Sequence, residues 1–227
     1  MRPQNRFHLH IIANCNFALN DKRYTWRHDS VLSAMDNGLR AHIINHNESQ
    51  RSRPKIPNIN STFVRPGEQR TKKKQQPNSL LDGASDWQLL TDFDHAKMVF
   101  PPEILSTTRR PDSVLWSMSA KKVILLELTC PAEEGFAEAS TRKVTRYSEL
   151  TDALQNAKWT PFHFAYEVGA RGFVAKSTHH CLSKLGLPAT AKKELTRSMS
   201  SISARCSFTI YLSRESLAWD RNRPLLS

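Results

Sequence analysis

The chain has 227 residues, of which 39% are hydrophobic and 24% charged, as expected of a globular protein with polar stretches. No window approaches the roughly eighteen uninterrupted apolar residues of a membrane span, which argues against a membrane partner. The four cysteines lie far apart without a Cys-x-x-Cys pair. This excludes the disulfide framework of a small secreted domain and favours a reducing compartment.

The formal net charge of +12 is concentrated in the N-terminal third of the chain. Residues 1–79 hold 14 Lys+Arg against 5 Asp+Glu, whereas residues 80–227 hold 19 against 16. A basic arm beside a nearly neutral domain favours a polyanionic partner, most simply a nucleic acid. A basic surface without such a partner is also compatible with the charge alone.

The first motif is half of a zinc knuckle. His10 and Cys15 have the spacing His-x4-Cys of its second half. A closed structural zinc site needs four ligands, and the nine residues before His10 hold no cysteine. His8 and His28 could be recruited, but their spacing gives little reason for it. We therefore expect a truncated knuckle that does not bind zinc.

Residues 23–29 (RYTWRHD) interleave cations with aromatic rings. Arg23 and Arg27 suit phosphate contact, and the rings suit base stacking. An equally good reading is a loop whose Trp26 packs on the next helix.

The next two segments are predicted to be a helix and a linker. Asp29 is a good N-cap for a helix over residues 29–46, whose apolar residues recur every four positions. Residues 47–79, with four prolines and few apolar side chains, indicate a solvated linker. Its charge run could grip a DNA backbone, serve as a nuclear localisation signal, or have no specific role. That run is Lys72, Lys73 and Lys74.

Two candidate metal ligands lie in a predicted β-hairpin over residues 109–129, after a first strand at residues 86–93. Asp112 starts one strand of the hairpin, and Glu127 interrupts the apolar run 123–130 of the other. Two carboxylates that converge suit a divalent metal with oxygen ligands. Alternatively, Asp112 is a turn residue and Glu127 pairs with a core Arg or Lys.

After the hairpin, residues 133–159 are predicted to be largely helical. Lys143 and Tyr147 share one face with the apolar residues Leu150 and Leu154. If this face covers the sheet, Lys143 leans toward Glu127, where it could stabilise charge on a phosphate. The alternative for Lys143 is a surface residue with its stem on apolar neighbours.

The next strand is predicted over residues 161–173. Gly169 and Gly172 allow a bulge or a close backbone approach. Arg171 is expected to contact DNA phosphate or a core carboxylate, and Glu167 to support the site. The last segment, residues 207–219, is expected to pack on the core through Phe208, Tyr211, Leu212 and Trp219.

These stretches resemble a restriction-like endonuclease of the PD-(D/E)XK type. More closely, they resemble the endonuclease region of the reverse transcriptase polyproteins that site-specific non-LTR retrotransposons encode. The resemblance runs from about His10 to Trp219. It rests on RYTWRHD, on Arg-Pro-Asp followed after fourteen residues by Glu127, and on the stretches ELTCP (127–131) and EVGARGF (167–173).

The resemblance implies an α/β fold with a restriction-endonuclease-like core. We expect a central mixed sheet flanked by helices, with an N-terminal helical and basic extension. The implied activity is DNA nicking for target-primed reverse transcription in the nucleus, with Mg²⁺ or Mn²⁺ held by Asp112 and Glu127. DNA contacts are expected from Arg109, Arg110 and Arg171. Element RNA and the missing polymerase portion would be further partners.

One position departs from the superfamily pattern, because Thr129 stands where a lysine usually follows the strand acid. The retrotransposon branch is known for placing this lysine on the next helix, which implies catalytic roles for Lys143 and Tyr147. A catalytically inactive DNA-binding fragment is the alternative, and an unselected pseudogene product is a third reading. The expected division is a knuckle remnant plus helix (1–46), a linker (47–79) and the nuclease domain (80–227).

Overall fold

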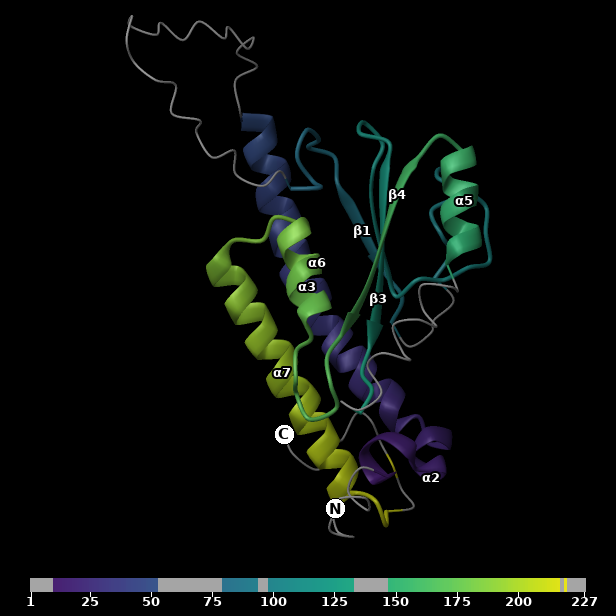
Figure 1. Cartoon of the computed structure of the whole chain (residues 1–227), viewed down its shortest axis with the longest axis vertical. Coiled ribbons are helices and arrows are strands. Elements are labelled where there is room, and N and C mark those ends of the chain that lie inside the picture. Colours follow the sequence, from purple (N-terminus) through teal and green to yellow (C-terminus); the bar gives the residue numbers. More distant parts are fainter. Residues whose placement is uncertain (1–9, 53–78, 94–97, 133–146, 217–218, 220–227) are drawn as a thin grey trace, which may run out of the picture.

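The computed structural model describes residues 10–52, 79–93, 98–132, 147–216 and 219. They form a mixed α/β structure, as predicted, in which a four-stranded sheet is flanked by helices (Figure 1). In chain order the elements are the π-helical turn η1 (His10–Asn14), α2 (Asn16–Asn20), α3 (Arg23–Ser52), β1 (Gln88–Thr91), β2 (Ser113–Ser117), β3 (Lys122–Thr129), α5 (Ser148–Asn156), β4 (Thr160–Glu167), α6 (Lys176–Lys184) and α7 (Ala189–Leu212). Among these helices none is long and apolar enough to cross a membrane.

The strands are ordered β1-β2-β3-β4 across the sheet. The predicted hairpin is confirmed, because β2 and β3 pair antiparallel with Ser113 opposite Leu126. Strand β4 pairs parallel to β3, with Thr129 opposite Glu167. A parallel neighbour requires a crossover connection, and α5 lies on this crossover (Figure 1).

The two central strands, β2 and β3, are buried on both faces. Alternate residues of β3 face opposite ways, so Ile124, Leu126 and Leu128 join one apolar cluster, whereas Val123 and Leu125 join another. The first cluster is covered by α3, α6 and α7, and the second by α5 (Figure 1). The prediction that this strand is covered on both sides is therefore confirmed.

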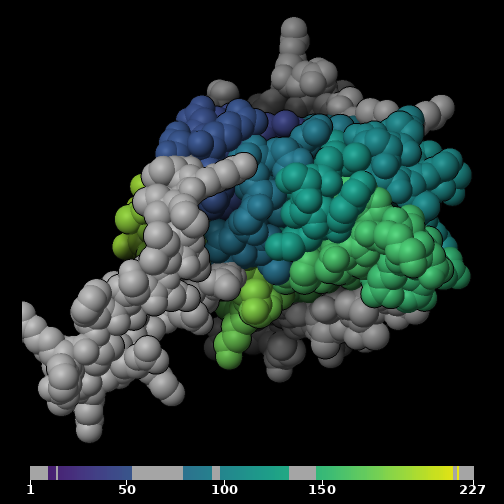
Figure 2. Space-filling model, turned by 90° about the horizontal axis from the view of Figure 1, so that it is seen from above, coloured from purple at the N-terminus to yellow at the C-terminus, as the bar shows by residue number. Residues whose placement is uncertain are grey.

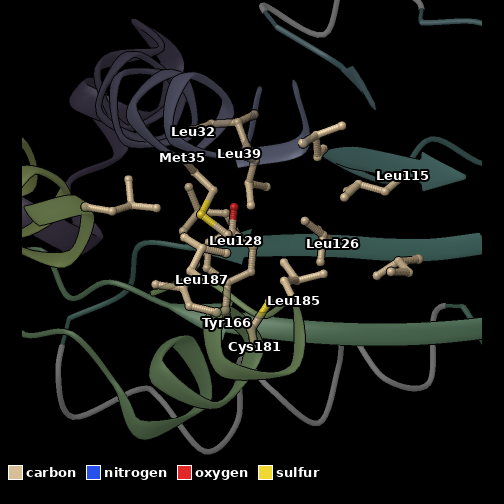
Figure 3. Close-up of a cluster of buried hydrophobic side chains, with 14 of the residues drawn as sticks. Leu32, Met35, Leu39, Leu115, Leu126, Leu128, Tyr166, Cys181, Leu185 and Leu187 are labelled. Atoms are coloured by element: carbon tan, nitrogen blue, oxygen red, sulfur yellow. The ribbon is translucent and has the colours of Figure 1, made fainter. Parts of the chain in front are cut away.

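Helix α3 supplies much of the larger core. The four-residue spacing predicted its buried face, formed by Val31, Met35, Leu39 and Ile43. Figure 3 shows Met35 and Leu39 directed toward Leu128 of β3, with Tyr166 of β4 and Cys181 of α6 nearby. The helix and the sheet thus share one core rather than separate ones.

Both predicted ends of α3 are wrong. The helix begins at Arg23, so Asp29 lies within it and is not its N-cap. It continues to Ser52, so the segment assigned to the linker from residue 47 starts as helix. The side chain of Asn47 holds this extension, because it exchanges hydrogen bonds with the backbone of Trp87 (2.9 and 3.2 Å). Figure 2 shows the blue C-terminal part of α3 packed against the teal strand region.

A close backbone approach follows β4, as predicted from its glycines. Gly172 has φ +93°, and a Cβ atom there would lie 2.7 Å from the carbonyl oxygen of Ser200 in α7. The packing expected of the last segment is wrong for two of its residues, because Phe208 and Leu212 are exposed, whereas Trp219 packs against Trp26. In this part of α7 the buried residues are Cys206, Ser207, Thr209 and Ile210.

Candidate functional site

Asp112 and Glu127 lie together at one end of the sheet. The amide of Asp112 donates a hydrogen bond to Oε1 of Glu127 (3.2 Å), and the amide of Leu128 donates to Oδ2 of Asp112 (2.7 Å). Each carboxylate therefore contacts the backbone of the opposite strand. Glu127 is 1% exposed and the Asp112 side chain 15%, so the pair is buried on one side and reaches solvent through Asp112.

The strand directions explain this meeting. Asp112 precedes β2, which runs antiparallel to β3, so the start of β2 lies beside the end of β3 that carries Glu127. The carboxyl end of β4 lies at the same edge because β4 is parallel to β3. In open α/β sheets, ligands bind in the crevice beyond the carboxyl ends of the strands.

The electrostatics of the neighbouring core reflect this concentration of acids. Burial raises the pKa of Tyr166 well above its usual value, and the nearby Asp112 and Glu127 carboxylates raise it further. The Tyr166 hydroxyl is buried and has no hydrogen-bond partner among the described residues. This hydroxyl therefore stays protonated.

A histidine that the sequence did not assign to this site lies beside the acids. Nε2 of His28 is 3.4 Å from Oδ2 of Asp112, and Nδ1 is 3.0 Å from Oδ1 of Asp29. The sequence suggests His28 only as an alternative zinc ligand, whereas the structure places it against Asp112. No spacing rule could have found this contact, because 84 positions separate the two residues.

Arg23 and Arg27 are buried. Arg27 donates to the carbonyl oxygens of Ile12 (2.7 Å) and Cys130 (2.9 Å) and to Oγ of Ser207 (2.9 Å). Arg23 donates to the carbonyl oxygens of Ser213 (2.5 Å) and Ser216 (2.8 Å), which follow α7. In this conformation neither guanidinium can contact a DNA phosphate, so both arginines join the N-terminal helix to the rest of the fold.

The alternative reading is right only in that Trp26 packs internally, because residues 23–29 belong to helix α3 rather than to a loop. Trp26 packs edge-on against Trp219, with 5.3 Å between ring centroids. Tyr24 is also engaged internally, because its hydroxyl donates to the carbonyl oxygen of Ile11 and accepts from the amide of Cys15. Burial raises the pKa of Tyr24.

The expected zinc remnant does not come together with further ligands that the structure describes. His10 is exposed and Cys15 is half-buried. Within residues 10–52, 79–93, 98–132, 147–216 and 219, no three His, Cys, Asp or Glu side chains are grouped to hold a metal ion. Asp112 and Glu127 are thus a two-carboxylate candidate, which suits Mg²⁺ because that ion keeps several of its waters.

Tyr147 supports the loop that leads to Asp112. It precedes α5, is buried, and donates from its hydroxyl to the carbonyl oxygen of Arg110 (2.8 Å). Leu150 and Leu154 are buried on the same face, as predicted. Tyr147 also lies against His163 of β4, with ring centroids 5.5 Å apart.

Three of the arginines expected to contact DNA are exposed and belong to loops at the acid end of the sheet. Arg109 and Arg110 precede Asp112, and Arg171 lies in the turn after β4. Arg109 pairs with the exposed Glu149 at 2.6 Å. Exposed ion pairs of this kind contribute little to stability, so this guanidinium can exchange its partner for a phosphate.

Glu167 is a buried acid at the end of β4. One of its oxygens accepts from the Ser177 hydroxyl, at the N-terminal turn of α6, and the other has no partner among the described residues. Opposite it on β3, the hydroxyl of Thr129 is likewise buried and without a partner there. The printed contact of Glu167 is thus with α6, and its expected role in supporting the site stays a prediction.

Lys143, together with Lys72, Lys73 and Lys74, lies outside the described residues. No protein-family model matches the chain, and a search of curated proteins finds no match.

Proposed function

We propose that this chain is a metal-dependent DNA-nicking domain of the restriction-like type, derived from a non-LTR retrotransposon polyprotein. One observation carries the proposal. Asp112 and Glu127, the two acids of the resemblance, each bind the backbone of the other's strand at the carboxyl end of β3. Mg²⁺ is usually held by one or two carboxylates together with waters and substrate phosphates, and this pair can supply the carboxylates.

The order of the elements supports the same proposal. Three antiparallel strands, a crossover with α5, and a parallel fourth strand make up the mixed sheet. A mixed sheet flanked by helices is what the resemblance implies for a restriction-endonuclease-like core. Because one fold can serve many functions, the activity has to be argued from the side chains at the sheet end.

Each residue of the proposed site has a distinct role. Asp112 and Glu127 would hold Mg²⁺ or Mn²⁺, which when bound would lower the pKa of the attacking water and withdraw charge from the phosphate. Arg109, Arg110 and Arg171 would bind backbone phosphates at the exposed rim. Hydrolysis would leave a free 3′ hydroxyl, the end that target-primed reverse transcription extends.

Lys143 keeps the catalytic role that the resemblance implies, whereas the buried Tyr147 takes a positioning role instead. Lys143 would stabilise negative charge on the scissile phosphate. Tyr147 would hold the loop of Arg110, and with it the start of β2, through its hydrogen bond to the loop carbonyl.

Plasmid nicking tests the proposal. Supercoiled plasmid is incubated with Mg²⁺ and the wild type, Asp112→Asn or Glu127→Gln. Conversion to the open circle should fall about 100-fold or more in both variants, because each loses a metal ligand worth several kcal/mol in the transition state. Asp86→Asn is the control, since Asp86 binds Ser117 and Ser119 at the other end of the hairpin. Equal nicking by all four proteins would reject the assignment.

An inactive DNA-binding fragment is the second candidate, favoured by Thr129. Its uncharged hydroxyl occupies the usual lysine position and is buried. This candidate predicts salt-sensitive DNA binding without cleavage, unchanged by Glu127→Gln. A gel-shift titration at several salt concentrations, run beside the nicking assay, separates the two.

A further inference from the structure

His28 links the N-terminal helix to the acid pair. It lies in the second turn of α3, and its ring stands between two carboxylates. Nδ1 is 3.0 Å from Asp29 and Nε2 is 3.4 Å from Asp112. All three side chains are between 14% and 18% exposed, so the contact is largely shielded from solvent screening.

The neighbouring Arg27 explains why His28 is held there. Its buried guanidinium donates to the carbonyl oxygen of Cys130, the residue that follows β3. It also donates to Ser207 of α7 and to Ile12. These bonds fasten the first turns of α3 to the end of the strand that carries Glu127, so the next residue along the helix faces Asp112.

The same oxygen of Asp112 is thereby held from two sides. Oδ2 accepts the amide hydrogen of Leu128 at 2.7 Å from β3 and faces the imidazole of His28 from α3. A carboxylate fixed by neighbours of this kind keeps one orientation, which is what a metal ligand needs. Asp29 fixes the histidine ring in turn through Nδ1.

We propose that His28 is a positioning residue of the metal site, oriented by Asp29 and acting through the carboxylate of Asp112. The inference rests on the proposed function, because it assigns to His28 the alignment of a proposed metal ligand. It adds that helix α3 completes the metal site, so the sheet and α5 alone do not suffice.

Two amide variants separate the contacts that the ring makes. The amide of glutamine extends to the place of Nε2 and can still reach Asp112, whereas that of asparagine stops near the place of Nδ1 and reaches only Asp29. The test is calorimetric titration of the full chain with MnCl2, with thermal unfolding of each variant alongside. His179→Gln, at an exposed position of α6, is the matched control.

We expect His28→Asn to weaken Mn²⁺ binding about 10-fold or more, the usual effect of removing a residue that orients a metal ligand. His28→Gln should retain most of the affinity, and His179→Gln should retain all of it. Equal affinity of wild type and His28→Asn, with Asp112→Asn still abolishing binding, would overturn the role of His28 alone. If both His28 amide variants unfold, the residue serves the fold, and the inference is equally overturned. A wild type that binds no Mn²⁺ would instead remove the proposed function and the inference with it.

Discussion

The buried Tyr166 and the half-buried Tyr24 differ in whether their hydroxyls are hydrogen-bonded. The Tyr166 hydroxyl has no partner among the described residues, whereas that of Tyr24 donates one hydrogen bond and accepts another. Both hydroxyls have raised pKa values through burial, so both are neutral at physiological pH. Burial of an unpaired hydroxyl is unfavourable, and burial of a paired one is not.

We predict opposite effects for the two Tyr→Phe substitutions. Tyr166→Phe removes an unsatisfied group and should leave the free energy of unfolding unchanged or raise it by about 1 kcal/mol. Tyr24→Phe removes the hydrogen bonds to the amide of Cys15 and the carbonyl of Ile11, and should lower the free energy of unfolding by about 1–3 kcal/mol. Urea unfolding of both variants measures the difference. A larger loss for Tyr166→Phe would show that its hydroxyl has a partner.

The imidazole of His42 makes stability depend on pH. Burial lowers its pKa, its hydrogen bond to the carbonyl of Leu185 opposes this, and His46 lowers it further. The unfolded chain therefore binds a proton more readily than the folded one, so stability rises with pH through this window. The free energy of unfolding should fall as the pH drops below about 6.5.

The change in unfolding free energy between pH 7.5 and 5.5 should be smaller in His42→Gln than in the wild type. Glutamine keeps a donor for Leu185 but cannot be protonated in this range. His179→Gln, on an exposed position of α6, should behave like the wild type. Identical pH curves for all three proteins would contradict the assignment.

At the scale of the elements, periodicity predicted the buried faces of α3 and α5 but not the packing at the end of α7, and helix ends were predicted poorly. The spacing of Val31, Met35, Leu39 and Ile43 defined the buried side of α3 because helical periodicity is local. The start of α3 was missed because Arg23 and Arg27 are stabilised by carbonyls far away in the chain. The role of His28 could not be predicted either, because its partner Asp112 is 84 positions away in the chain. The hairpin was predictable because its whole pattern lies within twenty-one consecutive residues.

Two glycines with nearly the same φ differ in how closely other atoms surround them. Their substitution by alanine separates the cost of backbone strain from the cost of steric crowding. Gly83 has φ +90°, and a Cβ atom there would have no neighbouring atom within 4 Å, whereas a Cβ atom at Gly172 would lie 2.7 Å from a carbonyl oxygen of α7. Gly83→Ala should lower the free energy of unfolding by roughly 1 kcal/mol through its φ alone. Gly172→Ala should lower it by roughly 1–3 kcal/mol more, because α7 must also move. Equal losses of unfolding free energy in the two variants, measured by thermal or urea unfolding, would mean that α7 moves away from residue 172 without cost.

At the scale of the whole molecule, charge and chemistry are separated along the chain. The basic excess lies in residues 1–79, and the acid pair lies in the nearly neutral remainder. We therefore propose that the basic run Lys72, Lys73 and Lys74 adds affinity for DNA, whereas the acid pair at the end of the sheet cleaves it. Backbone contacts carry no base information, so this affinity should be independent of sequence.

Salt dependence tests that division. Replacement of Lys72, Lys73 and Lys74 by Ala should flatten the slope of log affinity against log salt by up to about 3 units, since each phosphate contact releases counterions. Relative affinities for different DNA sequences should hardly change. An unchanged slope in binding titrations would show that these three lysines do not contact DNA phosphates.

Anomalous diffraction from crystals grown with Mn²⁺ shows whether Asp112 and Glu127 form one metal site. A manganese peak is expected at about 2.2 Å from a carboxylate oxygen of each residue, a usual metal–oxygen distance. The peak should be lost in Asp112→Asn crystals. A wild-type map without manganese between these two carboxylates, from crystals that bind the ion elsewhere, would mean that the two acids do not share a metal.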